Sequence, residues 1–319
     1  MSFKPRNLLL FGATGQIGAF ILDALLSARD EFERIAIFTS QNTVETKADS
    51  LVRLKKNGVE IIVGEISDEE AVGKAYEGID TVISAVGRGA ILAQIPLIRL
   101  ASAAPSVKWF LPSEYGTDIA YSPASAYEKP HQGKLKIRAY LENKIEVPHL
   151  AYTYVVTGPY ADMYVYLLGE GPRAVGGWDA KEKKSTLVGE KGEGRVSLTT
   201  MKDVGTLVLA TLRHPAESWN RALKVNSFTT TPAAIQAEFE RQTGGERWTD
   251  VTYTSLPELR TLENQAWESG APTAPLITLR RIWAEGGTLY EKRDNAMIGE
   301  PPVQTLEEVV AQELQRVNS

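Results

Sequence analysis

Hydrophobic and polar positions follow two alternating periods along the first half of the chain. Short apolar runs such as Leu8–Phe11 are typical of buried strands, and each precedes a segment whose apolar positions recur at helical spacing. Strands that alternate with helices indicate parallel βαβ units, and the right-handed crossover rule favours a doubly wound sheet. The pattern predicts strands at residues 8–11, 34–39, 59–63, 81–86, 107–111 and 152–156, and helices at 17–28, 47–57, 68–76, 90–103 and 133–143. Because Pro96 interrupts the fourth helix, we expect that helix to start at Gln94 or Ile95.

The second half of the chain breaks this rhythm. Residues 181–184 form a charged cluster that we interpret as solvated, and residues 187–199 as a loop and a strand. Helices are predicted at 203–212 and 232–243, and strands at 222–228 and 248–253. Thr305 and Glu308 have the spacing of a capping box, which predicts a final helix through about Gln315. We therefore expect an α/β fold, a Rossmann-like doubly wound parallel sheet with a smaller α+β C-terminal domain.

Composition and charge exclude several classes of protein. The chain of 319 residues has no cysteine, which excludes disulfide frameworks, thiolate metal sites and cysteine nucleophiles and favours a reducing cytoplasm. Its three histidines lack ligand spacing, so no metal site is expected. The net charge of -5 makes nucleic acid an unfavourable partner. No apolar run approaches the roughly 18 residues of a membrane-spanning helix, so no membrane association is expected.

A glycine-rich loop lies between the first strand and the first helix. It reads Gly12-Ala13-Thr14-Gly15-Gln16-Ile17-Gly18. Gly12 suits the tight turn, Gly15 the approach of a pyrophosphate, and Gly18 the packing of helix on strand. The helix start offers free N–H groups to phosphates. Glycine spacing alone also fits an ordinary turn, but the strand–turn–helix context favours a dinucleotide site.

The end of the second strand indicates which dinucleotide. Proteins that bind NAD usually have an acidic residue there, whereas this strand ends in Thr39 and Ser40, without a carboxylate to repel a 2′-phosphate. Lys47 follows and offers a cation. These residues favour NADPH as the cofactor; the alternative is that the hydroxyls belong only to a turn.

Three further motifs carry a resemblance to a known family. They are Ser84-Ala85-Val86-Gly87 after the fourth strand, Phe110–Gly116 (FLPSEYG) after the fifth, and Lys134–Arg138 (KLKIR) on a helix. Together with the glycine loop, they resemble the NmrA-like, isoflavone reductase-like group of atypical short-chain dehydrogenases, over residues 7–159. The resemblance implies that residues 12–18 bind the pyrophosphate, that Lys134 transfers a proton and that Arg138 supports cofactor binding. Many plant members have arginine where this chain has Thr39; the loops are similar to those of fungal members.

The chemistry of Lys134 agrees with that role. Lys134 and Arg138 are one turn apart and face the same side of a helix. A lysine beside another cation has a lowered pKa and exchanges protons closer to neutral pH. The alternative from the helix alone is a solvated basic face. Tyr140 and Lys144 match the Tyr-x-x-x-Lys pattern of ordinary short-chain dehydrogenases, but Tyr140 is about 240° around the helix from Lys134, so we interpret that match as coincidence.

Other candidate residues flank this helix and the sixth strand. Thr157 and Gly158 end that strand, where the fold places backbone against the cofactor. His131 is a candidate pocket or loop residue, and Glu114 and Asp118 either orient Lys134 or cap a turn. The candidate substrate wall, made of residue types that are more often plain core, is Tyr160, Met163, Tyr164 and Trp178.

The sequence thus predicts an NADPH-dependent reductase. Hydride would pass to an aromatic or quinone-methide-like small molecule of secondary metabolism, with Lys134 as the proton-transfer residue. One alternative is a non-catalytic NADP(H)-sensing regulator that acts through protein partners; another is a reductase or isomerase of a sugar-like substrate. Residues 1–157 and 196–218 are predicted to form the NADP-binding domain, and residues 158–195 and 219–319 the substrate domain. We expect a cytoplasmic monomer or homodimer.

Overall fold

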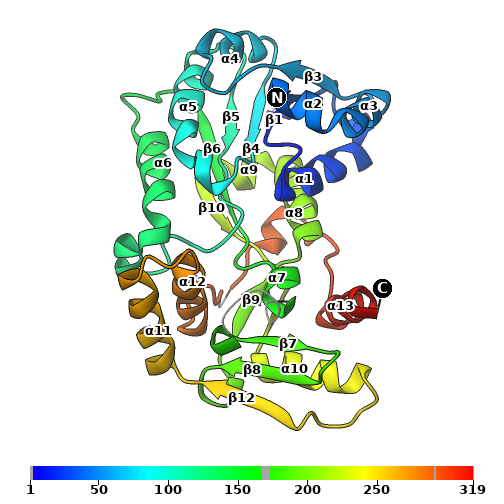
Figure 1. Ribbon diagram of the computed structural model, residues 1–319. Helices are drawn as coiled ribbons and strands as arrows, with labels where there is room; N and C mark the ends of the chain where they lie inside the picture. The colour runs from blue at the N-terminus through cyan, green and yellow to red at the C-terminus, as the bar shows by residue number, and fades with distance from the viewer. Residues whose placement is uncertain (1–2, 167–172, 291, 319) are drawn as a thin grey trace.

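A seven-stranded parallel sheet forms the centre of the larger lobe (Figure 1). The computed structural model describes residues 3–166, 173–290 and 292–318. The strand order β10-β6-β5-β4-β1-β2-β3 reverses direction between β1 and β4, where doubly wound sheets form their binding crevice. The strands are β1 (Asn7–Phe11), β2 (Arg34–Thr39), β3 (Glu60–Val63), β4 (Thr81–Ser84), β5 (Trp109–Leu111), β6 (Ala151–Val156) and β10 (Arg221–Lys224).

Helices cover both faces of this sheet because successive strand residues point to opposite sides. Leu10 packs with α1 and α8 in one buried cluster, whereas Phe11 packs with α4, α5 and α6 in another. Gly205 of α8 lies so close to α1 that a Cβ there would be 2.2 Å from the carbonyl oxygen of Phe20. The helices are α1 (Gln16–Ser27), α2 (Gln41–Thr46), α3 (Ala48–Lys56), α4 (Glu69–Ala75), α5 (Gln94–Ala103), α6 (Gln132–Glu142), α8 (Met201–Arg213) and α9 (Pro215–Ser218).

The smaller lobe is built around a separate aromatic core. Trp178, Phe239 and Trp283 are buried there together with Ile282. Its strands form a three-stranded sheet, β12-β8-β7, and a two-stranded sheet, β11-β9. The elements are α7 (Ala161–Tyr166), β7 (Gly177–Asp179), β8 (Lys184–Val188), β9 (Val196–Leu198), β11 (Phe228–Thr230), α10 (Pro232–Gln242), β12 (Asp250–Thr254), α11 (Leu256–Glu268), α12 (Ala274–Ala284) and α13 (Leu306–Asn318).

The predicted fold class and the elements of the first half are confirmed. Every strand predicted there belongs to the parallel sheet, and α5 begins at Gln94. The predicted capping box is also present, since Thr305 N–H donates to the Glu308 carboxylate at 2.8 Å and Glu308 N–H to the Thr305 hydroxyl at 3.3 Å. It starts α13, which runs to Asn318.

The second half differs from its predicted pattern. The strand predicted at 222–228 is two strands. The first of them, β10, falls within the predicted substrate domain but pairs with β6 and so belongs to the large sheet. Lys184, expected in a solvated cluster, begins β8, whose later residues are buried. Helices α7, α9, α11 and α12 and strand β7 were not predicted, nor was α2 in the first half. Residues 167–172 of the predicted smaller domain lie outside the described residues.

Among the described residues, no helix has the length and apolar character needed to cross a membrane.

Candidate active site

The glycine loop after β1 forms a cradle of backbone. Gly12 has φ +75°, and a Cβ there would be 2.5 Å from the carbonyl oxygen of Ala85. A Cβ on Gly18 would be 2.0 Å from the carbonyl oxygen of Gly12. Gly15 caps the start of α1 without a side chain, so the first N–H groups of the helix, at Gln16 and beyond, have no intrahelical partner. The glycines therefore let the loop fold tightly on itself and against the turn after β4, and the free N–H groups at the start of α1 suit a pyrophosphate.

The end of β2 lies beside this loop. The Lys47 amine donates to the carbonyl oxygen of Thr14 at 2.6 Å, and its side chain is exposed. The Ser40 hydroxyl accepts the Thr43 N–H at 3.2 Å and so caps α2, while Thr39 is buried at the strand end. Lys47 thus lies next to the glycine loop, whereas Ser40 caps a helix.

The turns after β4 and β5 meet next to the glycine loop. Ala85 contacts Gly12 as described, and the Val86 carbonyl oxygen accepts a hydrogen bond from the Ser113 hydroxyl at 2.9 Å. The hydroxyl of Ser84 is buried and has no hydrogen-bond partner among the described residues. These turns lie at the carboxyl end of the sheet, where the fold binds ligands.

Lys134 is the first basic side chain of α6 and points to the turn after β5. Its amine donates to the carbonyl oxygen of Glu114, and the side chain is half-buried. Burial lowers the pKa of Lys134; the charge of Glu114 opposes this effect, and the charges of Arg138 and Arg88 add to it. The amine is therefore prepared to release a proton more readily than an ordinary lysine.

Arg138 lies one turn further along α6 and is buried. Its guanidinium donates to both carboxylate oxygens of Glu114, at 2.9 and 3.0 Å, and lies 3.9 Å from Asp118. The same guanidinium lies 4.4 Å above the centre of the Tyr154 ring. Arg138 is thus committed to Glu114, and any support it gives to a cofactor acts through the β5 turn.

The end of β6 lies next to the turn after β5. Gly158 has φ +70°, and its N–H donates to the carbonyl oxygen of Gly116 at 2.9 Å. Thr157 is buried, and its carbonyl oxygen accepts from the Thr199 hydroxyl at 2.6 Å. The β5 and β6 turns are thereby joined next to Lys134.

The four predicted substrate residues separate into two groups. The Tyr160 hydroxyl donates to the carbonyl oxygen of Tyr115, which follows the carbonyl that accepts from Lys134. Tyr164 and Trp178 are buried in the aromatic core of the smaller lobe, with ring centres 6.1 Å apart. Met163 is 40% exposed. Only Tyr160 is therefore tied to the turn that carries the Lys134 contact.

The two other candidates near Lys134 have different surroundings. His131 is buried, and its Nδ1 lies 3.1 Å from the carbonyl oxygen of Ser125, while burial lowers the pKa of its imidazole. Burial also raises the pKa of Tyr140; the charge of Glu146 adds to this effect, and the charge of Arg99 opposes it.

Sequence reasoning missed two residues of this region. Arg88, the first residue of the short 3₁₀ helix Arg88–Ala93, is exposed and acts electrostatically on Lys134. Tyr290 of the smaller lobe is buried, with its hydroxyl oxygen 3.7 Å from where a Cβ of Gly158 would lie. No local pattern marks either residue; both reach the site through tertiary structure.

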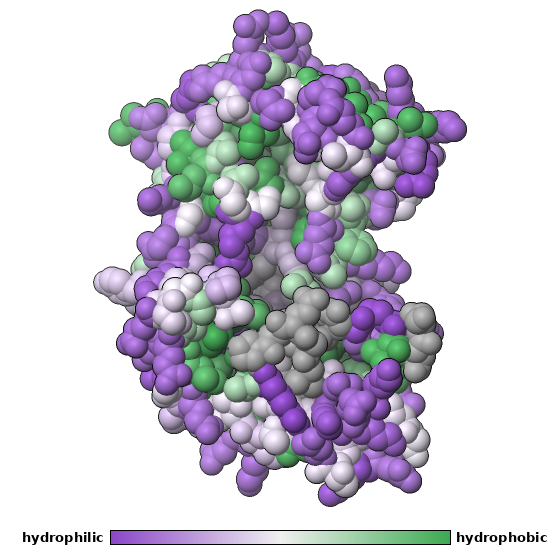
Figure 2. All heavy atoms as spheres, viewed as in Figure 1, coloured by the Kyte–Doolittle hydropathy of each residue, from purple (hydrophilic) through white to green (hydrophobic). Residues whose placement is uncertain are grey.

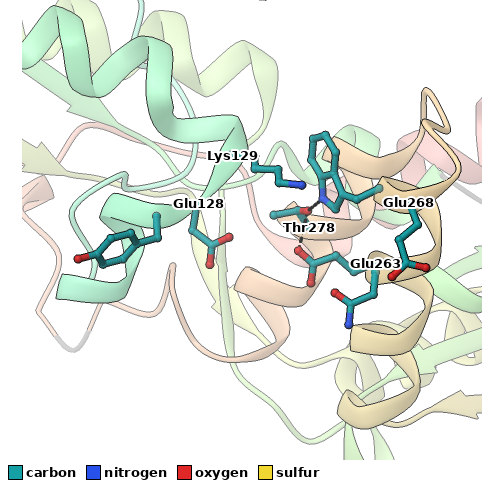
Figure 3. Close-up of a pocket in the computed structure, with 8 residues that line it drawn as sticks. Glu128, Lys129, Glu263, Glu268 and Thr278 are labelled. Atoms are coloured by element: carbon teal, nitrogen blue, oxygen red, sulfur yellow. Dashed lines mark hydrogen bonds between the residues drawn. The ribbon is translucent and has the colours of Figure 1, made fainter.

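A separate cavity of about 330 Å³ lies between the segment before α6 and helices α11 and α12 (Figure 3). Several of its polar groups already have partners. Trp267 donates to Thr278 at 2.9 Å, and Thr278 donates to Glu263 at 2.7 Å. Arg281 pairs with Glu263 at 2.6 Å and with Glu128 at 2.7 Å. We therefore interpret this cavity as part of the seam between the lobes.

The candidate site instead lies where the molecule is hollowed between its lobes, a hollow visible in Figure 2. There the phosphate cradle, the β4 and β5 turns and α6 meet. Within the described ranges, no group of three or more histidine, aspartate or glutamate side chains is placed to hold a metal ion.

Comparison with known proteins gives consistent matches. The model of the NmrA-like family matches residues 4–289. Isoflavone reductase homolog P3 of Arabidopsis thaliana is 28% identical over 90% of both chains, and phenylcoumaran benzylic ether reductase IRL1 of Ginkgo biloba is 27% identical over 92% of both. The structure of the leucoanthocyanidin reductase–NADPH complex from Vitis vinifera has a TM-score of 0.79 at 21% identity, covering 97% of this chain and 99% of that one.

Proposed function

Because the chain belongs to the NmrA-like family, we propose that it is an NADPH-dependent oxidoreductase that reduces an aromatic or quinone-methide-like small molecule. The observation that carries the proposal is the half-buried amine of Lys134. It has a lowered pKa and donates a hydrogen bond to the β5 turn, beside the phosphate cradle. Relatives named as reductases of isoflavones and of phenylcoumaran benzylic ethers support an aromatic substrate.

The residues of the larger lobe suit a bound NADPH, which supplies hydride. Gly12, Gly15 and Gly18 let the loop fold tightly at the start of α1, whose free N–H groups suit the pyrophosphate, and Lys47 offers a cation beside Thr14 for the 2′-phosphate. A nearby carboxylate would repel that phosphate, and the turn after β2 has none between Thr39 and Val44. The NADPH complex of the similar leucoanthocyanidin reductase supports this choice of cofactor. Other residues proposed to line the cofactor are Thr14, Gln16, Ile17, Thr39, Ser40, Ser84, Ala85, Val86, Thr157 and Gly158.

Lys134 is proposed to donate the proton that completes the reduction. When a quinone methide gains hydride at its exocyclic carbon, its oxygen becomes a phenolate, which then takes one proton to give the phenol. The Glu114 carbonyl only accepts hydrogen bonds, so it orients the protonated amine without removing its proton. Arg138 pairs with the Glu114 carboxylate, and its positive charge opposes the effect by which that carboxylate holds the proton on Lys134.

The smaller lobe is proposed to cover the substrate. This lobe comprises residues 158–195 and 219–319 without β10. Its Tyr160 and Tyr290 approach the β5 and β6 turns. We expect the reaction to take place in the cytoplasm, in a monomer or a homodimer.

A hydride-transfer assay tests this function against the alternative of a non-catalytic NADP(H) sensor. Loss of NADPH absorbance is followed with a panel of aromatic and quinone-methide acceptors, for the wild type and for Lys134→Ala. We expect turnover that falls about 10²- to 10⁴-fold in the variant, the usual contribution of a general acid. Tight NADP⁺ binding without turnover of any acceptor, unchanged in the variant, would favour the sensor.

A further inference from the structure

Arg88 lies on an element that borders the candidate site. It is the first residue of the 3₁₀ helix Arg88–Ala93, which follows the carboxyl end of β4. This short helix packs against the start of α6, where a Cβ on Gly133 would be 3.2 Å from Ile91. Arg88 therefore lies on the element that borders the first turn of α6, which carries Lys134.

The charge of Arg88 acts on two groups that meet at the same turn. After burial, which has the largest effect, Arg88 contributes to the lowered pKa of Lys134 and counteracts the raised pKa of Tyr160. Lys134 and Tyr160 come from different elements but donate to the adjacent carbonyl oxygens of Glu114 and Tyr115. The guanidinium of Arg88 is thus within electrostatic range of the point where these side chains converge.

The acidic side chains of this region are already committed to other partners. Glu114 pairs with Arg138, and Asp118 forms an ion pair with Lys224 at 2.9 Å. Asp162 accepts the Met201 N–H at 2.7 Å. Each of these carboxylates is thus engaged with a partner other than Arg88.

Arg88 itself is exposed and has no hydrogen-bond or ion-pair partner in the part of the chain that the structure describes. Among the described residues, the Lys134 amine has one hydrogen-bond partner, the neutral carbonyl oxygen of Glu114. The site therefore holds two cations without a paired carboxylate, in a protein of net charge -5. Such a local excess of positive charge favours anions.

We propose that Arg88 binds a carboxylate on the aromatic substrate, so that the protein prefers aromatic acids to their neutral analogues. This rests on the proposed function, which places the substrate beside Lys134. A carboxylate fits because the guanidinium offers two parallel N–H donors that match its two oxygens. The cofactor phosphates have their own donors at the start of α1 and at Lys47.

Binding to the NADP⁺-saturated protein tests this proposal by calorimetry. The probes are 4-hydroxycinnamate and its neutral analogue 4-hydroxycinnamyl alcohol, and the variants are Arg88→Gln and, as a control, Arg247→Gln, another exposed arginine, in the smaller lobe. We expect the wild type to bind the acid at least about tenfold more tightly than the alcohol, because a charge-assisted hydrogen bond is worth roughly a factor of ten or more. Arg88→Gln loses that preference, whereas its affinity for the alcohol and for NADP⁺ is unchanged, and Arg247→Gln matches the wild type.

Three results would overturn the proposal. Weakened NADP⁺ binding in Arg88→Gln would make Arg88 a cofactor residue. A wild type that does not bind the acid, or does not prefer it to the alcohol, would contradict the proposal, and so would an unchanged preference in the variant. Because calorimetry needs no turnover, an Arg88-dependent preference for the acid would support this proposal even if no acceptor were reduced. If neutral acceptors alone were reduced, only the function proposed above would be supported.

Discussion

The guanidinium of Arg138 donates to both carboxylate oxygens of Glu114, at 2.9 and 3.0 Å, from a position one helical turn beyond Lys134. The backbone carbonyl of the same Glu114 accepts from the Lys134 amine. One residue of the β5 turn therefore connects the two basic residues of α6. The carboxylate of Glu114 is neutralised by Arg138, while its carbonyl fixes the direction of the Lys134 amine.

The lowered pKa of Lys134 predicts the pH dependence of the reaction. A lysine that donates a proton acts in its charged form, so kcat/KM falls as pH rises through its pKa. We expect this alkaline limb below the ordinary lysine value of about 10.4, because burial lowers the pKa of the amine. Steady-state rates at saturating NADPH measure it. A rate that rises with pH through this range would instead make Lys134 a general base.

Replacing Arg138 is predicted to change both the pKa of Lys134 and stability. Arg138→Met removes a positive neighbour of the amine and exposes it to the full charge of Glu114, so the alkaline limb moves to higher pH. The carboxylate of Glu114, 2% exposed, is left without its ion pair, which costs about 3–5 kcal/mol in urea denaturation.

The double variant Glu114→Gln/Arg138→Met provides the control for this prediction. It removes both charges, so we expect part of the lost stability to return. A limb that stays in place in Arg138→Met would show that the pair has no electrostatic effect on Lys134.

The phosphate cradle is predicted to tolerate no side chain at Gly18. In Gly18→Ala the new Cβ would meet the carbonyl oxygen of Gly12 at 2.0 Å, so the loop must move. We expect about 1–3 kcal/mol of destabilisation and NADPH affinity reduced more than tenfold, measured by NADPH fluorescence. Gly73→Ala is the matched control, since Gly73 lies in α4 and nothing is within 4 Å of its Cβ position. Equal NADPH affinity in the two variants would remove the glycine loop from the cofactor site.

Lys47 is predicted to determine the preference for NADPH over NADH. Its amine lies 2.6 Å from the carbonyl oxygen of Thr14, beside the turn without a carboxylate. Lys47→Ala is expected to lose about tenfold in NADPH affinity, the usual effect of a lost charge-assisted hydrogen bond, with NADH affinity unchanged. Lys55→Ala, an exposed lysine of α3, serves as the control. A parallel loss for both cofactors would place the Lys47 contact elsewhere than at the 2′-phosphate.

The larger lobe could be predicted from sequence because its signals are local. Apolar runs such as Leu8–Phe11 and the glycine loop at Gly12–Gly18 lie within single βαβ units. The smaller lobe depends on long-range pairing: β8 pairs with β12 across more than sixty residues and begins at a lysine that looks solvated. One local signal was overlooked, the capping box of Ser255 and Glu258 that starts α11.

The site was predicted only as far as its motifs extend. The family resemblance led to Lys134, but its contact with Glu114 and the pairing of Arg138 arise from packing between α6 and the β5 turn. Aromatic composition alone did not separate Tyr160, which contacts that turn, from Trp178, which is plain core. Burial and partners of this kind become visible only in three dimensions.

Transfer of deuterium from NADPH labelled at the reactive carbon of its nicotinamide tests the central claim most directly. The acceptor is an aromatic quinone methide, and mass spectrometry counts deuterium in the product of the wild type, Lys134→Ala and the control Tyr140→Phe. We predict one deuterium per product, with Tyr140→Phe as active as the wild type and Lys134→Ala about 10²- to 10⁴-fold slower at unchanged NADPH affinity. Full activity of Lys134→Ala together with an inactive Tyr140→Phe, or no deuterium in any product, would contradict the account.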